Sequence, residues 1–231
     1  MNEDKVVISL QKINVSFYRS ESDNFTLKKS ILSGKFIPQK QEIFNSFSLE
    51  VKESTILGIE GSNGIGKTTL LSVIAGIIPI SSGKRIVNGK VLPLLGLGHI
   101  FHNDLDIYRN IELWNLSFET NFTINEKFVD EVITSSGLKI QPKTLVRSLS
   151  SGMKSRLAFE LAMRGQEEIL LLDEIFSVGD KNFREKSRLK MKEKLKTIKC
   201  AIIISHDYDV LNENCNKIIR ITNGSSFEQI K

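Results

Sequence analysis

One short stretch of the chain decides the fold. It reads Gly61-Ser62-Asn63-Gly64-Ile65-Gly66-Lys67-Thr68 and matches G-x-x-x-x-G-K-[ST], the pattern of a phosphate-binding loop. Its glycines leave room for backbone N–H groups to curl round a phosphate, which a side chain would keep at a distance. We expect Lys67 to reach the β- and γ-phosphates of a nucleotide, Thr68 to place its hydroxyl on Mg²⁺, and Thr69 to contact the α-phosphate.

The segments on either side have the character that such a loop requires. Thr55–Glu60 reads as a short strand that runs into the loop, and a helix is predicted from Lys67 to about Ile77, where Pro79 ends it. The positive end of this helix points at the anion that the loop would hold. A chance glycine-rich turn is the alternative, and the flanking strand and helix argue against it.

A second apolar strand, Ile169–Asp173, ends in two acidic residues. Asp173 stands at the carboxyl end of this strand, where its oxygens can hold Mg²⁺ directly or through water. Glu174 is one residue further out, so we expect it to polarise the water that attacks the γ-phosphate. A buried strand that simply exits into solvent is the alternative, and the presence of the phosphate loop disfavours it.

A third apolar segment, Ala201–Ser205, repeats this geometry and is followed by His206. Parallel strands deliver their carboxyl ends to one edge of a sheet, where ligands bind in such folds. We therefore expect His206 to contact the γ-phosphate and to hold the environment of the attacking water. His99 and His102 have no comparable context and are assigned no role.

The rest of the chain alternates strands and helices around a mostly helical insertion. Alternating apolar residues predict two strands near the N-terminus, separated by a polar loop or short helix from Arg19 to Gln41, and a later strand pair that turns at Asn88-Gly89. Apolar runs without alternation predict a parallel sheet that is covered on both faces. The predicted strands are Val6–Val15, Ile43–Val51 and Arg85–Leu95 as a pair; the predicted helices are Asp104–Phe118, Ile124–Ser136 with a stop at Gly137, Ser151–Arg164 and Asp180–Thr197.

The composition is that of an ordinary soluble globular protein, with 231 residues, 40% hydrophobic and 26% charged. No apolar run approaches the roughly 20 residues of a membrane helix. The polar start Met1–Lys5 does not resemble a signal peptide. Cys200 and Cys215 lack a metal-binding spacing and are expected to be reduced thiols. The net charge of +5 fits a nucleotide, an anionic surface or an acidic substrate, and equally a slightly basic cytosolic protein.

One further motif connects these features to a known family. The run Leu149-Ser150-Ser151-Gly152-Met153 opens a predicted helix and is similar, with two substitutions, to the LSGGQ signature of the ABC ATPase family. The resemblance implies an α/β P-loop NTPase core of ABC type, with an antiparallel β subdomain and a helical subdomain inserted at about 99–165, in a single domain over 1–231. It implies that Ser150, Ser151 and Gly152 close over the ATP of a second copy in a head-to-tail homodimer. Asp180 falls where the family's D-loop aspartate stands.

The segment from Asp173 to Asp180, with Phe183 and Lys186 after it, resembles the ATPase subunits of polysaccharide exporters. The segment Leu92–Gly98 resembles the same group. The likeness implies ATP hydrolysis with Mg²⁺, coupled to export of a lipid-linked polysaccharide such as O-antigen, capsule or teichoic acid. It also implies separate polytopic permease subunits, a place at the cytoplasmic face of the cell membrane, and no nucleic-acid partner. The alternatives are a transporter ATPase for another cargo and a soluble ABC ATPase without a transport role.

Three departures from the family pattern bear on these expectations. The usual Q-loop glutamine is absent near Gly98–His102, so the sequence does not identify the residue that takes its role. An early aromatic residue should stack on adenine. Tyr18 or Phe17 is the candidate, and the equal alternative is that the candidate is a core aromatic on its strand. The chain ends at Lys231 and leaves no room for the carbohydrate-binding domain that some O-antigen exporters carry.

Overall fold

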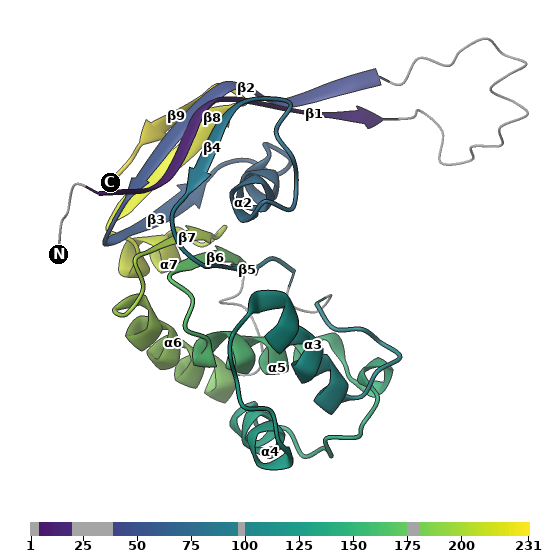
Figure 1. Cartoon of the computed structure of the whole chain (residues 1–231). Helices are drawn as coiled ribbons and strands as arrows, with labels where there is room; N and C mark the ends of the chain where they lie inside the picture. The colour runs from purple at the N-terminus through teal and green to yellow at the C-terminus, as the bar shows by residue number, and fades with distance from the viewer. Residues whose placement is uncertain (1–4, 20–38, 97–99, 175–180) are drawn as a thin grey trace, which may run out of the picture.

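Two β-sheets and two groups of helices make up the computed structural model, which describes residues 5–19, 39–96, 100–174 and 181–231 (Figure 1). An antiparallel sheet and helix α2 (Lys67–Ala75) lie in the upper half of the view. The lower half holds the helices α3 (Ile107–Phe118), α4 (Glu126–Ser135), α5 (Ser151–Arg164) and α6 (Lys181–Leu195). A mainly parallel sheet begins in the middle of the view and continues into the upper half.

The antiparallel sheet has the strand order β2-β1-β4. Its strands are β1 Val6–Arg19, β2 Gln39–Lys52 and β4 Ser82–Val87. The two predicted N-terminal strands are therefore confirmed, and both are longer than their apolar alternation indicated. The polar stretch predicted between them falls mostly on 20–38, outside the described residues.

The parallel sheet has the order β5-β6-β7-β3-β8-β9, in which only β9 is antiparallel to its neighbour. Alternate residues of β6 lie in two different apolar clusters, Leu170 and Leu172 in one, Ile169 and Leu171 in the other. Both faces are thus covered, as the uninterrupted apolar runs predicted. The strands are β3 Thr55–Glu60, β5 Val91–Leu94, β6 Ile169–Asp173, β7 Cys200–Ile204, β8 Lys217–Asn223 and β9 Ser226–Gln229.

The predicted strand pair over Arg85–Leu95 is wrong. β4 pairs with β1 in the antiparallel sheet, whereas β5 pairs with β6 in the parallel sheet. The Asn88-Gly89 turn carries the chain from one sheet to the other, and the Asn88 amide donates to Val7 O at 2.9 Å. An Asn-Gly pair indicates a turn in the chain but not the partner of each flanking strand, which here lies far away in the sequence.

Helix α2, Lys67–Ala75, packs between the two sheets (Figure 1). Its buried Leu70, Leu71, Val73 and Ile74 share one apolar cluster with residues of both sheets. The helix ends earlier than the predicted Ile77, because Gly76 adopts a left-handed conformation and its amide donates to carbonyls of the last turn. Pro79 therefore is not what ends it.

The segment between β5 and β6 is helical and builds the second apolar cluster with the other face of the parallel sheet. Asp106 and Asn125 cap two of its helices by accepting hydrogen bonds from backbone amides, so each helix begins two or three residues later than its apolar spacing indicated. Gly137, predicted as a stop, has φ of +70° just beyond the second helix. The helices are α3 Ile107–Phe118, α4 Glu126–Ser135 and α5 Ser151–Arg164; α6 Lys181–Leu195 and α7 Tyr208–Asn214 follow later in the chain.

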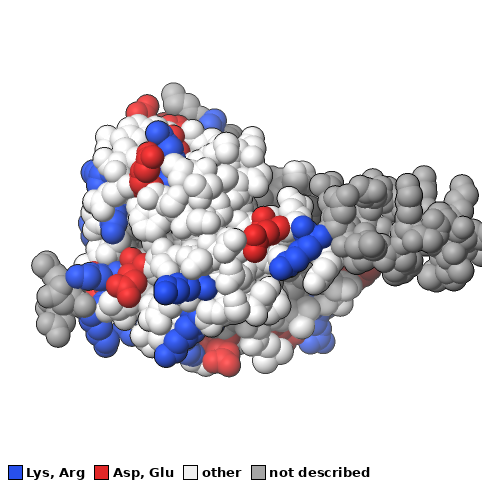
Figure 2. Space-filling view, turned by 90° about the horizontal axis from the view of Figure 1, so that it is seen from above, with Lys and Arg blue, Asp and Glu red and all other residues white. Residues whose placement is uncertain are grey.

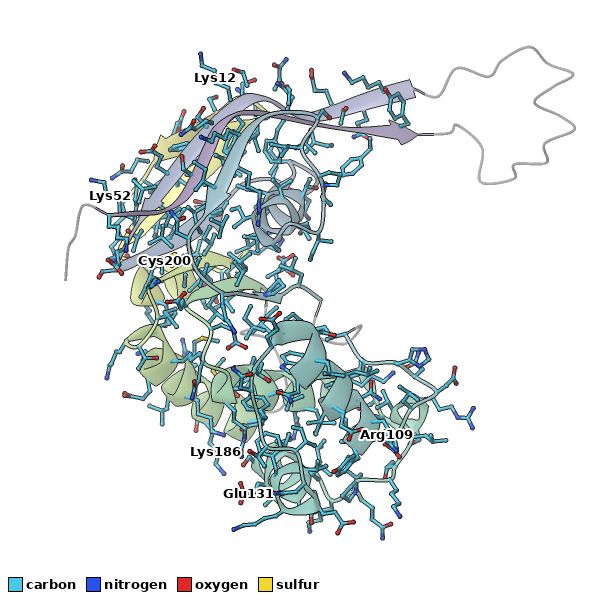
Figure 3. All side chains as sticks on the ribbon, viewed as in Figure 1. Lys12, Lys52, Arg109, Glu131, Lys186 and Cys200 are labelled. Atoms are coloured by element: carbon cyan, nitrogen blue, oxygen red, sulfur yellow. The ribbon has the colours of Figure 1, made fainter. Side chains whose placement is uncertain are left out.

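Seen from above, acidic and basic side chains are interspersed on a mostly white surface, so this face carries no extended patch of one sign (Figure 2). Among the described residues, no helix combines the length and apolar character that crossing a bilayer requires. Cys200, which lies on β7 in the interior (Figure 3), and Cys215 are both free and buried. Burial raises the pKa of each thiol to about 12.

Candidate nucleotide-binding site

Three strands end together at one edge of the parallel sheet. Ile59 and Asp173 are both in register with Ile204, from opposite sides of β7. The loops that follow β3, β6 and β7 therefore leave the sheet at the same edge, where ligands bind in open α/β folds. This register brings together the three sequence motifs predicted to share a site.

The loop from Gly61 to Gly66 joins β3 to α2 without a side-chain cap at the helix start. Gly66 has φ of +105°, and a Cβ atom there would lie 2.7 Å from Ile43 Cγ2 of β2. Gly64 has φ of +78°, and a Cβ atom there would meet nothing within 4 Å, so the loop is open on that side. The loop backbone thus needs glycine at both positions and leaves space for a ligand beside Gly64.

Lys67 is folded into this loop. Its Nζ donates to Gly61 O at 2.7 Å and to Ser62 O at 3.0 Å, and the residue is only 7% exposed. Ser62 and Asn63 are exposed beside it, and Ile65 closes the turn through its amide to Ser62 O at 3.3 Å. The ammonium therefore stands inside the loop, at the start of a helix whose free N–H groups face the same space.

Thr68 and Asp173 meet where α2 and β6 converge. Thr68 Oγ1 donates to Asp173 Oδ2 at 2.7 Å. A hydroxyl and a carboxylate are oxygen ligands of the kind that Mg²⁺ prefers, usually together with waters and substrate phosphates. Among the described residues no group of three or more His, Cys, Asp or Glu gathers, so this pair fits a cation that also takes ligands from a nucleotide. Thr69 is half-buried next along the helix.

Glu174 and His206 face one another at the ends of β6 and β7. Glu174 Oε1 lies 2.6 Å from His206 Nε2, and 51% of each side chain is exposed. Glu174 has φ of +54°, an uncommon conformation for a residue with a side chain, and its amide donates to Ile204 O at 3.1 Å. The backbone thus turns sharply after Asp173 and directs the two acids differently, Asp173 toward Thr68 and Glu174 toward His206.

The signature residues lie on another element. Ser150 caps α5 by accepting the Met153 amide at 3.2 Å, and Ser151 and Gly152 are exposed in the first turn. In Figure 1, α5 lies in the lower half and α2 in the upper half. No hydrogen bond joins Ser150, Ser151 or Gly152 to the phosphate loop in the part of the chain that the structure describes. One chain therefore presents these residues outward instead of adding them to its own loop.

Tyr18 stands near the outer end of β1, opposite Lys40, and is 71% exposed, while Phe17 is 39% exposed. The alternative that Tyr18 is a core aromatic is therefore wrong. The same strand pair contacts the phosphate loop, because Ile43 and Phe44 approach Gly66. Stacking of Tyr18 on adenine stays a prediction. Asp180 lies outside the described residues.

Sequence reasoning missed a contact that supports the loop from behind. Arg220 of β8 donates from Nη2 to both carboxylate oxygens of Glu60, at 3.1 and 3.2 Å, directly before Gly61. The two residues are register partners in neighbouring strands. They are 160 positions apart in the sequence, so no local pattern could have paired them.

The fold and the site define a class: an α/β nucleotide-binding protein whose phosphate loop joins a central parallel strand to a helix. Within this class, the sequence profile described as "ABC transporter" matches residues 44–177, more than half of the chain. The chain belongs to the ABC transporter family. The family predicted from the signature and loop motifs is thereby confirmed.

Curated relatives come from export systems of the predicted kind. The chain is 34% identical over 185 residues to the O-antigen export system ATP-binding protein RfbE of Yersinia enterocolitica, covering 80% of this chain and 77% of RfbE. It is 31% identical over 227 residues to the teichoic acids export ATP-binding protein TagH of Lactococcus lactis, covering 97% of this chain and 48% of TagH. The O-antigen export system ATP-binding protein RfbB of Myxococcus xanthus is 34% identical, with 77% of this chain and 40% of RfbB covered. The chain thus spans about half or less of the length of TagH and RfbB.

Solved structures confirm the predicted ABC-type fold. A dimeric post-hydrolysis state of an ATP-binding cassette bound to ADP and Pi superposes with a TM-score of 0.74 at 18% identity, covering 97% of this chain and 99% of that one. The ATP-binding subunit of an ABC transporter gives a TM-score of 0.74 at 13% identity, covering 97% and 90%.

Proposed function

We propose that this chain is the ATP-hydrolysing subunit of an ABC transporter that exports a lipid-linked polysaccharide of the O-antigen, capsule or teichoic acid type. Membership of the family and the named functions of RfbE, TagH and RfbB support the assignment. The observation that carries the chemistry is the convergence of Lys67, Asp173 and Glu174 at one sheet edge.

Nucleotide binding rests on the loop Gly61–Gly66 and on Lys67. The N–H groups of the loop and of the first turn of α2 bind the phosphates of ATP. Lys67 exchanges its two carbonyl contacts for phosphate oxygens, which bind an ammonium more strongly because they are charged. Tyr18, exposed near the same strand pair, stacks on the adenine ring.

Thr68 and Asp173 would hold Mg²⁺, which supplies charge neutralisation at the β- and γ-phosphates when bound. The hydrogen bond between the two side chains brings the Thr68 and Asp173 oxygens to one point. Thr69 contacts the α-phosphate from the next position of α2.

Hydrolysis places a water between Glu174 and the γ-phosphate. Glu174 accepts a hydrogen bond from this water and orients its lone pair for in-line attack on the γ-phosphorus. The bond from the γ-phosphorus to the β–γ bridging oxygen breaks, ADP leaves, and the proton of the water passes to the phosphate or to Glu174. His206, 2.6 Å from Glu174, fixes the carboxylate and contacts a γ-phosphate oxygen.

The exposed signature end of α5 supports a head-to-tail homodimer. Ser151 and Gly152 offer free N–H groups, with Ser150 as the cap, to the γ-phosphate held by a second copy. Asp180 would add to this interface. We take 1–231 as one ABC ATPase domain, with its helical subdomain at about 99–165. The dimer docks on separate polytopic permease subunits at the cytoplasmic face of the cell membrane and takes no nucleic acid.

The test combines enzymology with co-purification. The purified chain should hydrolyse ATP only with Mg²⁺. When the chain is tagged and purified from membranes extracted in mild detergent, a polytopic permease with bound glycolipid should co-purify with it. A permease with a different cargo would keep the transporter and overturn the polysaccharide. Soluble partners alone, with ATPase activity intact, would overturn the transporter and favour a soluble ABC ATPase.

A further inference from the structure

The signature helix α5 is tied to helix α6 along its length by three contacts of different chemistry. Because α5 begins at the signature residues, these ties bear on how one chain presents that end to a second copy. The inference below rests on the proposed function, since it concerns the ATP-bound dimer.

The strongest tie joins Glu160 of α5 to Lys190 of α6. Lys190 Nζ donates to both carboxylate oxygens, each at 2.6 Å. The Glu160 side chain is only 3% exposed, whereas that of Lys190 is 41% exposed. A buried carboxylate needs a partner, because an unpaired charge in the interior is costly. Glu160 therefore holds Lys190 firmly, and through it α6.

An aromatic contact forms the second tie, between the start of α6 and the middle of α5. Phe183 of α6 meets Phe159 edge to face, with ring centroids 5.9 Å apart. The guanidinium of Arg156 stands over the Phe183 ring at 5.0 Å from its centroid. Phe183 is buried, so this contact places the first turn of α6 against the middle of α5.

The third tie, at the far end, is weaker. Lys194 of α6 donates to Gly165 O, beyond the last residue of α5, and lies 3.8 Å from Glu167. Neither Glu167 carboxylate oxygen accepts a hydrogen bond in the described residues. Burial raises the pKa of Glu167 and lowers the pKa of Lys194, so this pair favours its charged form less than an exposed pair would. Glu160 and Lys190 are thus the pair on which the alignment of the helices most depends.

The start of α5 and the end of β6 serve different nucleotides in the proposed dimer. The start of α5, Ser151, is nine residues or about 13 Å along the helix from Glu160 and is offered to the nucleotide of the second copy. β6 lies between α5 and α6 in the chain and ends at Asp173, followed by Glu174, which serve the nucleotide of the same copy. The orientation of α5 relative to α6 therefore sets how one chain can reach both nucleotides at once.

We propose that Glu160 and Lys190 are positioning residues that align the signature end of α5 for the second copy's ATP. Without the pair, the signature end of α5 has more orientational freedom. Ordering that end on closure of the dimer then costs additional entropy. Binding of ATP to a single chain makes no use of α5, so it is unaffected. Loss of the pair should therefore weaken the dimer without changing nucleotide affinity. A purely structural role would change both quantities together.

The experiment measures both quantities in the full chain carrying Glu174→Gln, which should hold the ATP-bound dimer. Nucleotide affinity is measured with a fluorescent ATP analogue on dilute protein, and the dimer dissociation constant with Mg-ATP by sedimentation. Glu160→Gln keeps the shape of the buried side chain and removes its charge, and Lys190→Met removes the donor. Lys190→Arg retains a charge-assisted contact and is the conservative variant. Arg188→Met is the matched control, since Arg188 pairs with Glu213 at 3.0 Å, both about half exposed.

We expect Glu160→Gln and Lys190→Met to weaken the dimer at least about tenfold while nucleotide affinity changes less than about twofold. Lys190→Arg and Arg188→Met should match the parent in both measurements. A parent-like dimer constant in both loss variants overturns the proposal, and so does a parallel loss of nucleotide affinity, which marks a structural role. Failure of the parent to dimerise with ATP is a different result: it overturns the head-to-tail dimer and, with it, this inference.

Discussion

Thr68 Oγ1 donates a 2.7 Å hydrogen bond to Asp173 Oδ2, and this contact joins the first turn of α2 to the end of β6. The two residues are separated by 105 positions in the chain. Their side chains meet only because the strand before the phosphate loop and the strand before Glu174 both flank β7 in register. The contact therefore joins the two halves of the proposed site, the phosphate loop with α2 on one side and the end of β6 on the other.

Asp173→Asn should abolish ATP hydrolysis while the fold is kept. The amide preserves size and can still accept from Thr68, but it lacks the negative charge that a divalent cation requires. We expect kcat to fall at least about 100-fold, which corresponds to about 2.7 kcal/mol of transition-state stabilisation, and half-saturation to need more Mg²⁺. Titration of the ATPase rate with Mg²⁺ measures both. Asp209→Asn, on α7, is the control, and an unchanged Mg²⁺ dependence in Asp173→Asn would remove this residue from the metal site.

Lys67→Ala should weaken ATP binding about tenfold or more. The variant removes the only side-chain cation that the described loop encloses, and Gly61 O and Ser62 O lose their donor. Fluorescence titration with an ATP analogue gives the dissociation constant directly. Lys84→Ala, on the exposed part of β4, removes an equal charge away from the site and should bind as the parent does. Equal affinities in the two variants would show that the phosphates bind elsewhere.

Glu174→Gln should bind ATP as the parent does but hardly hydrolyse it. The amide cannot accept a proton from water, while the phosphate loop is untouched. With Mg-ATP we expect the variant to migrate as a dimer in size-exclusion chromatography, because the ATP that holds the dimer closed is no longer hydrolysed. Glu213→Gln neutralises an acid of similar exposure that pairs with Arg188 and should turn over normally. Normal turnover in Glu174→Gln would exclude a catalytic role for this residue.

Much of the site could be predicted because its determinants are local. The phosphate loop needs glycine where its φ is positive, as at Gly64 and Gly66, so this requirement falls on nearby residues of one short segment. Strand β6 is buried on both faces and ends in acids, which is again a local pattern. Such patterns predicted the class of protein and the edge of the sheet where the site lies.

What could not be predicted depends on pairings between distant segments. An Asn-Gly turn such as Asn88-Gly89 does not say whether its flanking strands pair with each other or with distant strands. Here β4 pairs with β1 and β5 pairs with β6, and residues of both sheets share one apolar cluster with α2. Likewise, Glu60 finds Arg220 because β3 and β8 are neighbours, a fact that no short window contains. The tie between Glu160 and Lys190 is hidden in the same way, because it joins two helices whose residues lie 30 positions apart in the sequence.

Gly66→Ala should damage both stability and nucleotide binding. A Cβ atom would lie 2.7 Å from Ile43 Cγ2, and the φ of +105° is strained for any residue with a side chain. We expect a loss of about 1–3 kcal/mol of stability and at least a tenfold weaker affinity for the ATP analogue. Thermal unfolding and fluorescence titration measure these quantities.

Gly64→Ala is the informative comparison, because its φ is also positive but its Cβ atom meets nothing within 4 Å. Equal effects in both variants would mean that backbone strain, and not the contact with β2, is the cause.

Removing the Cys215 thiol should make stability less sensitive to alkaline pH. Burial raises the pKa of this thiol to about 12, from an ordinary value of 9.0 in the unfolded chain. Between these two values the unfolded state binds fewer protons than the folded state, so the free energy of unfolding falls as pH rises. The slope is about 1.4 kcal/mol per pH unit for one thiol.

Cys215→Ala loses this contribution, although its cavity lowers stability at every pH. Urea unfolding at about pH 8 and about pH 10 should therefore show a smaller decline in the variant than in the parent. Parallel declines would mean that the pKa of this thiol is the same in the folded and unfolded chain, so that the apolar cluster which contains Leu211, Cys215 and Ile218 does not exclude water from it.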